Sequence, residues 1–540
     1  MQQTVIQYVL SRLHSLGVRD IFGVPGDCAL PINDAICDDP HLRWIGNCNE
    51  LNAAYAADGY ARIKGIAAIS TTHGVGELSA INGIAGSYAE HLPVFHLVGM
   101  PPTTTQQAHL LVHHTLGTGE FDLFFKMTEP VVCARTIITP ENCAAETERI
   151  INAALYHHRP VYMGIPQNYV HVPIQETAIP DAAPQSDPLA LETAVNKIID
   201  AVAKAKKACI LPGILISRLG LHNEAVAALD ASRLPFATML MDKGVFDETH
   251  PAYIGMYRGQ MGDPVVRDFI EDCDCILNLG AMLTDLNTGG FSAHLDPSKT
   301  IEILHHQVRL GSTVFQHVEM RDVLSALAKR LPKHTETGWP KVHRLEAPQG
   351  SAGDPINADY LYARWNQFLK PNDILIVEIG TPWIGLEFAH LPTGVTFHNQ
   401  SLWASIGWAT PAAFGAALAT STRRTVLITG EGSHQMTAQE ICQFPRYGLK
   451  PIIFVLNNNG YLIERVLSHK PDAVYNDVAT WHYQALPQVL GCTGWFTARV
   501  TTCGELDQAM DYAQACNTGA YVEVVTDTYA LPQALKRFGL

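Results

Sequence analysis

The segment 425–464 constrains the fold of this chain more than any other. Residues 425–429 form a short run rich in β-branched side chains, and residues 452–456 form a continuous apolar run, typical of a strand buried on both faces. Ser433 is expected to cap a helix between them that ends near Tyr447. Two strands joined by a helix are parallel, so the turns that follow them lie at one edge of a sheet. In open α/β sheets this is the edge where ligands bind.

Polar residues occupy both of these turns. Gly430-Glu431-Gly432 follows the first strand, and Asn457-Asn458-Asn459-Gly460 follows the second. A carboxylate on one turn and an amide oxygen on the other can share one Mg²⁺, which prefers oxygen ligands and often bridges to phosphate. A Gly-Glu-Gly sequence alone is more often only a turn. The Asn-rich turn a short way along the chain makes a cation site the stronger interpretation.

Composition limits the class of protein. At 540 residues the chain is long enough for about two to four domains. Its 47% hydrophobic and 16% charged residues indicate a globular protein with a large core. The net charge of −15 argues against nucleic acid and against an anionic membrane as partners. No export signal and no apolar stretch of about 18 residues are visible, which predicts a cytoplasmic protein without a membrane span.

The cysteines predict neither a metal site nor a disulfide framework. Among the 12 Cys, only Cys273 and Cys275 are closely spaced, in an acidic segment that leads into a predicted strand. A pair of buried or free thiols is the better interpretation. Without an export signal, disulfides are not expected.

Strands and helices alternate along the chain. Apolar residues at helical spacing over 4–16 predict a helix that ends at Gly17, and strands follow near 65–71 and 94–98. This alternation indicates parallel sheets. The segment after the first linker has no Gly-x-Gly-x-x-Gly fingerprint, so it does not indicate a nucleotide. The predicted fold class is α/β, with three domains that are each a mainly parallel, doubly wound sheet flanked by helices: 1–175, 190–335 and 356–540, joined by Pro-rich linkers at 172–188 and 332–355.

Several charged residues outside the two turns are candidates for chemistry, although each alone has a structural explanation. Asp27 follows Gly-Val-Pro-Gly, a turn sequence. Glu50 and Glu464 stand at predicted helix starts, where the helix dipole favours a negative charge. His113-His114 has no nearby Cys or acidic pattern, so the pair fits acid–base chemistry better than a metal site.

Taken together, these residues carry a resemblance that covers nearly the whole chain. In order along the sequence, they resemble the active-site signatures of the pyruvate/indolepyruvate decarboxylase branch of the thiamin diphosphate (ThDP) enzymes. The His-His pair is the specific element, because the acetohydroxyacid synthases and oxidases of this superfamily lack it. The matching stretches are Ile-Phe-Gly-Val-Pro-Gly-Asp27, Cys-Asn-Glu50, 71–83 (with His73 where an apolar aromatic is more usual), His113-His114-Thr-Leu-Gly, 285–291, 400–407 and Asn-Gly-Tyr-Leu-Ile-Glu464.

The resemblance implies ThDP and Mg²⁺ as cofactors. It implies that Glu431, Asn458 and the Gly460 carbonyl hold Mg²⁺ against the diphosphate, with Glu where the family usually has Asp. The domains would be pyrimidine-binding, middle and diphosphate-binding, in that order. The cofactor contacts implied by the family are Glu50, Thr72, Thr381, Ala404, Ile406, Gly432, Ser433, Asn458, Gly460 and Tyr461.

The resemblance also implies the catalytic roles. Glu50 would hydrogen-bond the pyrimidine ring of ThDP and so favour loss of the thiazolium proton. Asp27, His113, His114 and Glu464 would carry the protons needed to release the aldehyde. In the family, Glu50 and the metal segment of one active site come from different subunits. A homodimer is therefore the expected minimal active unit and a homotetramer the expected assembly, with a small 2-oxo acid as substrate.

The substrate pocket is the least determined part of the site. Trp383 would narrow it toward small 2-oxo acids, whereas Leu286 and Ile384 stand where aromatic residues are common and would widen it. Ile463 and Leu467 are expected to line it beside Glu464. Pyruvate, branched-chain 2-oxo acids and arylpyruvates all remain open at this point.

Two alternatives to a non-oxidative decarboxylase stay in view. One is a ThDP-dependent carboligase such as acetolactate synthase, against which the pair His113-His114 speaks. The other is a catalytically silent protein with a ThDP-enzyme fold, against which the complete acid–base set speaks.

Overall fold

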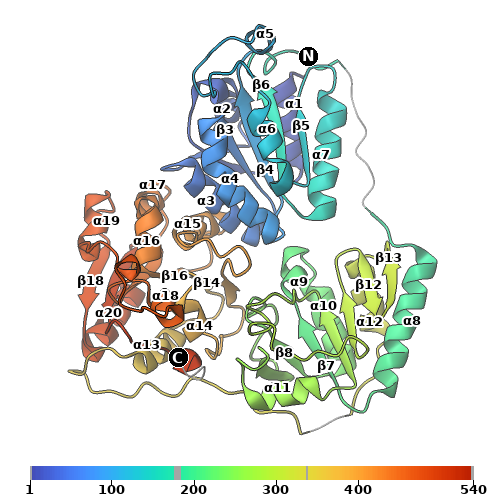
Figure 1. The fold of residues 1–540 in the computed structure, drawn as a ribbon, viewed down its shortest axis with the longest axis vertical. Coiled ribbons are helices and arrows are strands. Elements are labelled where there is room, and N and C mark those ends of the chain that lie inside the picture. Colours follow the sequence, from blue (N-terminus) through green and yellow to red (C-terminus); the bar gives the residue numbers. More distant parts are fainter. Residues whose placement is uncertain (1–2, 176–183, 336–337, 537–540) are drawn as a thin grey trace.

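The computed structural model describes residues 3–175, 184–335 and 338–536. Figure 1 shows three lobes: the N-terminal part of the chain at the top, the middle part at the lower right and the C-terminal part at the lower left. Each lobe is built on one sheet with helices against it. The predicted class, three α/β domains with mainly parallel sheets, is therefore confirmed.

The N-terminal domain contains a six-stranded, fully parallel sheet in the order β2-β1-β3-β4-β6-β5. Its strands are β1 (Asp20–Gly23), β2 (Arg43–Gly46), β3 (Ala67–Thr72), β4 (Val94–Met100), β5 (Ala134–Ile137) and β6 (Val161–Pro166). Its α-helices are α1 (Val5–Ser15), α2 (Leu30–Asp38), α3 (Glu50–Lys64), α4 (Val75–Ala89), α5 (Thr103–Gln107), α6 (Leu123–Met127) and α7 (Cys143–His157).

The C-terminal domain repeats this strand order in its own six-stranded parallel sheet, β15-β14-β16-β17-β19-β18. Its strands are β14 (Ile374–Val377), β15 (Thr396–His398), β16 (Thr425–Gly430), β17 (Ile452–Asn457), β18 (Phe496–Val500) and β19 (Ala520–Val525). Its α-helices are α13 (Ala358–Phe368), α14 (Thr381–Gly385), α15 (Ala409–Ala419), α16 (Glu431–Thr437), α17 (Gln443–Arg446), α18 (Leu462–Leu467), α19 (Leu486–Val489), α20 (Cys503–Ala515) and α21 (Gln533–Lys536).

The middle domain differs, because its seven-stranded sheet is mixed: β11, β12 and β13 pair antiparallel at one edge. Its strands are β7 (Ala208–Pro212), β8 (Phe236–Thr238), β9 (Tyr253–Met256), β10 (Cys275–Leu279), β11 (Thr300–Ile303), β12 (Gln307–Leu310) and β13 (Thr313–Gln316). Its α-helices are α8 (Pro188–Lys204), α9 (Ile214–Arg218), α10 (His222–Ser232), α11 (Pro264–Glu271) and α12 (Met320–Arg330).

The helix expected between β16 and β17 differs from the prediction. Ser433 does not cap it: α16 already begins at Glu431, with Gly430 in the N-cap position and no side-chain cap. The helix also does not run unbroken to Tyr447, since a 3₁₀ segment (Ala438–Cys442) separates α16 from α17. Gly430 has no side chain that could cap the helix. Strand β16 ends at Gly430, and α16 follows it without an intervening loop. As a result, Glu431 lies in the first helical turn.

The domain boundaries remain predictions. Residues 176–183 and 336–337 of the predicted linkers lie outside the described residues. The described parts of both linkers contain no helix apart from Pro188, with which α8 begins. No helix in the described parts of the chain combines the length and apolar character needed to cross a lipid bilayer.

The shared strand order places predicted site residues at equivalent edges of the two outer sheets. In each sheet the order reverses beside the first strand, at the β1–β3 pair and the β14–β16 pair. Ligands bind in open α/β sheets at the carboxyl ends of strands beside such a reversal. Asp27 follows β1 and Thr72 ends β3, while Thr381 follows β14 and Glu431 follows β16.

Helices α3 and α15 join the N-terminal and C-terminal domains, and both are built largely of small residues. A Cβ added at Gly59 would lie 2.1 Å from the Ala412 carbonyl oxygen, and one at Gly415 would lie 1.8 Å from the Ala56 carbonyl oxygen. The two backbones therefore approach more closely than any larger residue allows. One apolar core runs through this contact and includes side chains from both domains.

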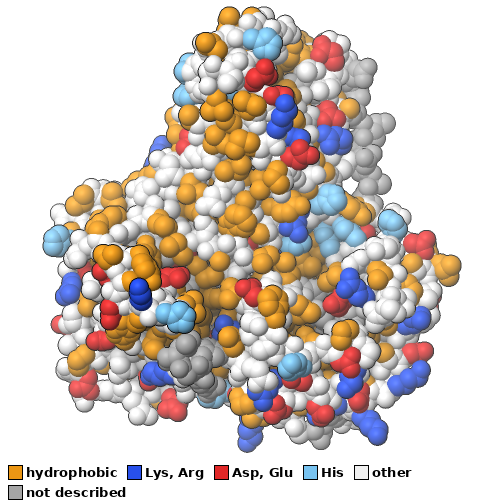
Figure 2. Space-filling model, viewed as in Figure 1, with side chains coloured by type: hydrophobic (Ala, Val, Ile, Leu, Met, Phe, Trp, Pro, Cys, Tyr) orange, Lys and Arg blue, Asp and Glu red, His pale blue; other side chains and the backbone are white. Residues whose placement is uncertain are grey.

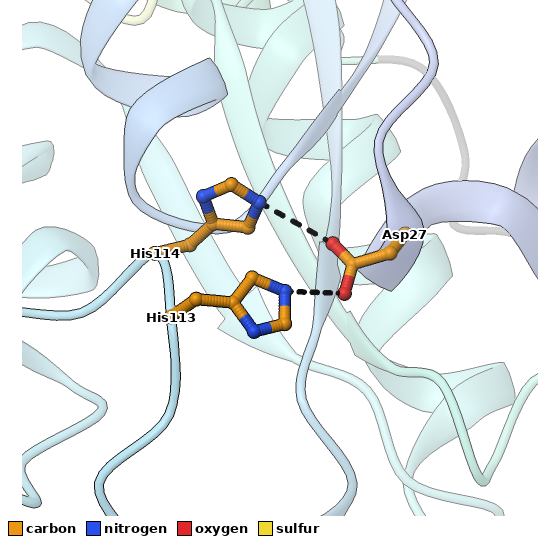
Figure 3. Close-up of side chains that lie close together, drawn as sticks. All are labelled: Asp27, His113 and His114. Carbon is orange, nitrogen blue, oxygen red and sulfur yellow. Dashed lines mark hydrogen bonds and ion pairs between the residues drawn. The ribbon is translucent and has the colours of Figure 1, made fainter.

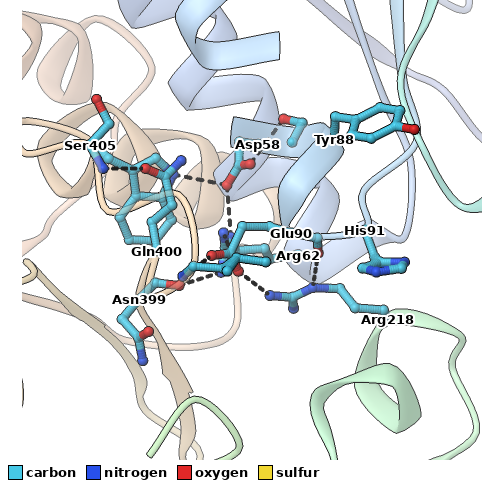
Figure 4. A network of polar contacts seen from close by, with 12 residues as sticks. Asp58, Arg62, Tyr88, Glu90, His91, Arg218, Asn399, Gln400 and Ser405 are labelled. Carbon is cyan, nitrogen blue, oxygen red and sulfur yellow. Dashed lines mark hydrogen bonds and ion pairs between the residues drawn. The ribbon is translucent and has the colours of Figure 1, made fainter. Parts of the chain in front are cut away.

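A buried ionic network connects all three domains (Figure 4). Arg62 on α3 and Arg218 on α9 place their Nη2 atoms 3.5 and 3.6 Å from Glu90 Oε2. The backbone N–H of Leu402, from the C-terminal domain, donates to Glu90 Oε1 at 2.9 Å. Burial lowers the pKa of Arg218 to about 10. Removing one partner from such a network leaves a buried charge without compensation, which is strongly destabilising.

Replacing Gly415 by Ala should destabilise the protein. The new methyl group would overlap the α3 backbone, and such overpacking costs about 1–3 kcal/mol of unfolding free energy, more than the gain of up to about 1 kcal/mol from helix propensity. Urea or thermal unfolding measures the change. Gly353→Ala is the control, because a Cβ there meets nothing within 4 Å. Equal unfolding midpoints for the two variants would contradict the close contact.

Candidate active site

Asp27, His113 and His114 come together at the edge of the N-terminal sheet (Figure 3). Asp27 follows β1, and the two histidines lie in the loop after β4. His113 Nε2 is 2.7 Å from Asp27 Oδ2, and His114 Nε2 is 3.4 Å from Asp27 Oδ1. One carboxylate therefore faces two imidazoles, an arrangement able to hold and transfer protons near neutral pH.

The electrostatics of this cluster favour the ionised form of Asp27. Partial burial alone would raise its pKa, but hydrogen bonds from His113 and from the Cys28 backbone, together with the two histidines, hold the pKa below its usual value. His114 has a positive φ of 61°, and a Cβ at Gly74 would lie 2.0 Å from the His114 carbonyl oxygen. Gly74 thus leaves room for the strained backbone that carries the pair.

Glu50 points toward the same sheet edge. It begins α3, whose N-cap Asn49 accepts a hydrogen bond from the Asn52 backbone. A Cβ at Gly76 would lie 3.2 Å from Thr72 Cγ2 and 3.3 Å from Glu50 Oε1. Thr72 and Glu50 therefore converge beside Gly76. Among the described residues, no hydrogen bond or ion pair is found for the Glu50 carboxylate, which leaves it open to a ligand.

The turn that carries Glu50 is held by Glu440, a residue that the sequence did not single out. Glu440 is fully buried in the C-terminal domain and accepts hydrogen bonds from Asn47 Nδ2 (2.8 Å), the Cys48 backbone (3.2 Å) and Asn52 Nδ2 (2.8 Å). Burial raises the pKa of Glu440 despite these bonds. A carboxylate next to the apolar Ile441, within a segment of the chain expected to be helical, was the available signal.

Glu431, Asn458 and Gly460 meet at the edge of the C-terminal sheet. Glu431 is 2% exposed, and its Oε1 accepts from the backbone N–H groups of Asn458 (3.1 Å) and Gly460 (2.8 Å). The Asn458 side-chain amide lies 3.2 Å from Glu431 Oε1 and 2.8 Å from the Gly460 carbonyl oxygen. If the amide nitrogen of Asn458 faces these two oxygen atoms, it donates a hydrogen bond to each. If the amide oxygen faces them instead, the oxygens of Glu431, Asn458 and Gly460 lie together, and a cation between them is needed to offset their repulsion.

This donor set fits Mg²⁺. A carboxylate, an amide oxygen and a backbone carbonyl are hard oxygen donors of the kind that Mg²⁺ binds. Burial raises the pKa of Glu431 to about 7, against the backbone hydrogen bonds that lower it. A nearby divalent charge would favour the ionised carboxylate. The side chain of Glu431 is one methylene longer than the Asp expected from the resemblance, and its carboxylate contacts the backbone of the 458–460 turn.

The remaining cofactor candidates lie around the same edge. A Cβ at Gly432 would lie 2.4 Å from the Tyr461 ring, so these two residues pack closely, and Ser433 is buried beside them in α16. Thr381 begins α14. Ala404 is exposed with a positive φ of 57°, and Ile406 is half-buried.

Glu378 is a second buried carboxylate that the sequence did not single out. It directly follows β14 and accepts from the backbone N–H groups of Gly407 (3.1 Å) and Ala409 (3.2 Å), which fixes the turn after Ile406. Burial raises its pKa to about 7. Its position at the carboxyl end of a buried strand was a signal that could have found it.

His73 departs from the aromatic residue more usual at its position. It is fully buried against Phe121 and Phe124, with ring centroids 6.2 and 5.4 Å away, and its Nδ1 lies 3.2 Å from Glu77 Oε1. Glu77 also accepts from the Gly74 backbone (2.8 Å) and from Tyr162 (3.0 Å). His73 therefore contributes to a polar network beneath the loop of His113 and His114.

The candidate pocket residues are only partly brought together. Trp383 and Ile384 are buried in the C-terminal core, and Leu286 and Ile463 are partly buried against that same core. The Nε1 atom of Trp383 has no hydrogen-bond partner. Leu467 is 66% exposed, and Glu464, in the first turn of α18, is exposed as well.

The predicted site residues thus form two separate sets in this chain. Asp27, Glu50, Thr72, His113 and His114 belong to the N-terminal domain, and the cation ligands with Glu464 belong to the C-terminal domain. Within the described residues, no hydrogen bond or ion pair joins a member of one set to a member of the other. Exposed apolar side chains lie close along the chain to these sets: Val75, Leu110, Leu111, Leu116, Trp403, Met436 and Leu467.

Family models match all three domains. The models describe the N-terminal TPP binding domain (residues 3–122), the central domain (195–331) and the C-terminal TPP binding domain (381–524) of thiamine pyrophosphate enzymes. The first match contains the whole N-terminal set of site residues, and the third contains the whole C-terminal set.

Full-length relatives agree with the family models. The alpha-keto-acid decarboxylase of Mycobacterium leprae is 39% identical over 98% of this chain and 94% of its own length. The proteins of the same name from Mycobacterium avium and from Mycobacterium tuberculosis (strain H37Rv) are 39% and 38% identical over 98% of this chain and 95% and 96% of theirs. The chain therefore belongs to the thiamine pyrophosphate enzymes, in the family of the alpha-keto-acid decarboxylases.

Proposed function

We propose that this protein is a ThDP- and Mg²⁺-dependent 2-oxo acid decarboxylase that releases an aldehyde and CO₂ without oxidation. The observation that carries the proposal is the cluster of Asp27, His113 and His114 (Figure 3). Release of an aldehyde requires proton donors, and the two histidines of this cluster would be those donors. The names of the relatives support the same reaction and the same class of substrate.

Glu431, Asn458 and the Gly460 carbonyl would hold Mg²⁺, and Gly432 and Tyr461 would border the diphosphate. When bound, ThDP supplies the thiazolium ring that accepts the electron pair released with CO₂. Glu50 would hydrogen-bond the pyrimidine ring, and the Glu440 hydrogen bonds keep its turn in place. Ile406, next to the Gly407 backbone that Glu378 holds, would support the cofactor.

Proton transfer is the task of Asp27, His113, His114 and Glu464. His113 is hydrogen-bonded to Asp27 and His114 Nε2 lies 3.4 Å from it, so either imidazole can hold a proton and deliver it to the substrate-derived carbon. General acid–base transfers of this kind contribute roughly 10²–10⁴-fold each. Glu464 is exposed in this chain and would complete the set when the two halves of the site meet.

A homodimer is the minimal active unit that we propose, with a homotetramer as the complete assembly. Two observations support a second copy: the site residues of one chain fall into two unconnected sets, and exposed leucines, Leu110, Leu111 and Leu116, lie on the loop of the two histidines. All 12 cysteines are free, which supports a reducing compartment such as the cytoplasm.

A coupled alcohol-dehydrogenase assay over pyruvate, 2-oxoisovalerate, phenylpyruvate and indolepyruvate tests the reaction. We expect aldehyde from at least one of these acids. Acetolactate as the main product from pyruvate would favour a carboligase, and no turnover with any of the four would favour a catalytically silent protein.

Replacing Glu50 by Gln should lower turnover by roughly 10²–10⁴-fold, the scale of one lost proton-transfer partner. Cofactor affinity should change little, because Glu50 and the Mg²⁺ ligands lie in different domains. Hydrogen–deuterium exchange at C2 of bound ThDP should slow sharply. Asp38→Asn, an exposed change in the same domain, is the control. Unchanged exchange in Glu50→Gln would show that Glu50 has another role.

Replacing Glu431 by Gln should weaken Mg²⁺ and ThDP together, because a negative charge that faces a divalent ion is lost. Glu431→Asp, which keeps the charge, should retain activity within about tenfold. After chelation, the enzyme is titrated with Mg²⁺ and ThDP, and tryptophan fluorescence reports binding. If Glu431→Gln recovers at wild-type concentrations, Glu431 is not a ligand.

Replacing Trp383 by Ala should raise the relative efficiency with branched or longer 2-oxo acids. Hydrophobic pockets discriminate by about 1–3 kcal/mol per methylene, so the shift in the ratio of kcat/KM values should be graded. Trp365→Ala is the matched control, since Trp365 is equally buried (1% exposed) in the same core. Both variants should lose stability, and only Trp383→Ala should change the ratio. A ratio unchanged in both would place Trp383 outside the pocket.

A further inference from the structure

Two thiols from different domains meet beside the turn that carries Glu50. Cys48 follows β2 and lies two positions before Glu50, whereas Cys442 ends the 3₁₀ segment after α16. Their sulfur atoms are 3.6 Å apart, although 394 residues separate them along the chain. Within the described residues, no other two cysteine sulfurs share a hydrogen bond. The fold therefore creates this pair, and the sequence gives no sign of it.

Only weak contacts surround the pair in this chain. Cys48 is exposed and Cys442 is half-buried. The Gln443 amide lies 3.6 Å from Cys48 Sγ, which in turn approaches the Gln439 carbonyl oxygen at 3.5 Å. These are weak contacts that a small rotation can break. A disulfide needs a sulfur–sulfur distance of about 2.0 Å, so the two sulfur atoms must approach each other by less than the diameter of one atom.

The two sulfurs are not equivalent. The hydrogen bond shared with Cys48, together with the Arg446 guanidinium, lowers the pKa of Cys442 although burial and the Glu440 charge raise it. The pKa of Cys48 is raised, first by its hydrogen bond to Cys442 and then by burial. Since the thiolate is the reactive form of cysteine, Cys442 is the attacking sulfur and Cys48 the resolving one.

We propose that Cys48 and Cys442 are a redox modification site, at which a peroxide converts the two thiols into a reversible disulfide between the N-terminal and C-terminal domains of one chain. The Cys442 thiolate attacks one oxygen of hydrogen peroxide. An S–O bond forms and the O–O bond breaks, and the hydroxide released takes up a proton to become water. Cys48, losing its proton, then attacks the Cys442 sulfur and displaces hydroxide, which takes up that proton as a second water. The thiols lose two electrons and the peroxide gains two.

The disulfide would link two segments that hydrogen bonds already hold together. The Cys48 backbone and its neighbours Asn47 and Asn52 are hydrogen-bonded to Glu440 before any oxidation. A covalent bond here holds the Glu50 turn against the C-terminal domain and closes a very long loop of chain, which restricts the unfolded state. The oxidised protein should therefore resist thermal unfolding better than the reduced one and should keep its activity.

Peptide mapping of the holoenzyme tests the proposal. Wild-type protein is treated with a small excess of hydrogen peroxide, alkylated, digested without reductant and analysed by mass spectrometry. We expect a linked peptide pair containing Cys48 and Cys442, two hydrogen atoms lighter than the free peptides and separated by dithiothreitol. The unfolding midpoint should rise by roughly 2–4 °C. A linked pair between two different chains, seen as a dimer without reductant, would overturn the proposal.

Three variants supply the controls. Cys48→Ser and Cys442→Ser should each abolish the linked peptide and the thermal shift, whereas Cys37→Ser, which removes a different exposed thiol, should keep both. In Cys48→Ser, dimedone should label Cys442 as a sulfenic acid. Oxidation of Cys37 in wild type without any link between Cys48 and Cys442 would overturn the proposal, as would a thermal shift that persists in Cys442→Ser.

Discussion

The backbone-to-backbone approach of α3 and α15 is the constraint on which the site depends. Only small residues allow it, since a Cβ at Gly59 or Gly415 would overlap a carbonyl oxygen of the facing helix. Because the two helices belong to different domains, this contact fixes the N-terminal domain, with Glu50 at the start of α3, against the C-terminal domain of the same chain. The apolar core around it then excludes water from both domains at once.

Buried carboxylates hold the loops that carry site residues in place. Glu440, Glu378 and Glu77 each accept hydrogen bonds from the backbone of a loop that carries a site residue. A buried carboxylate is costly unless it is hydrogen-bonded, so each loop is held in the position that satisfies its glutamate. The raised pKa values of Glu378 and Glu440 show that desolvation still dominates at these positions.

The sequence was sufficient for the fold class, because strand alternation is a local pattern, whereas the grouping of Asp27 with His113 and His114 was implied only by the family resemblance. It was insufficient for Glu440 and Glu378, whose partners lie hundreds or tens of residues away, and for the Cys48–Cys442 pair, which exists only after the domains pack. It was also wrong about Ser433. The strand passes through Gly430 directly into α16 at Glu431, and a propensity rule for capping residues does not predict this.

The identical strand order of the first and third sheets gives the two outer domains an internal pseudosymmetry. At the end of the third strand, equivalent positions hold Thr72-His73-Gly74 in one sheet and Gly430-Glu431-Gly432 in the other. One architecture therefore presents two different sets of side chains at equivalent edges, and the two domains are not interchangeable.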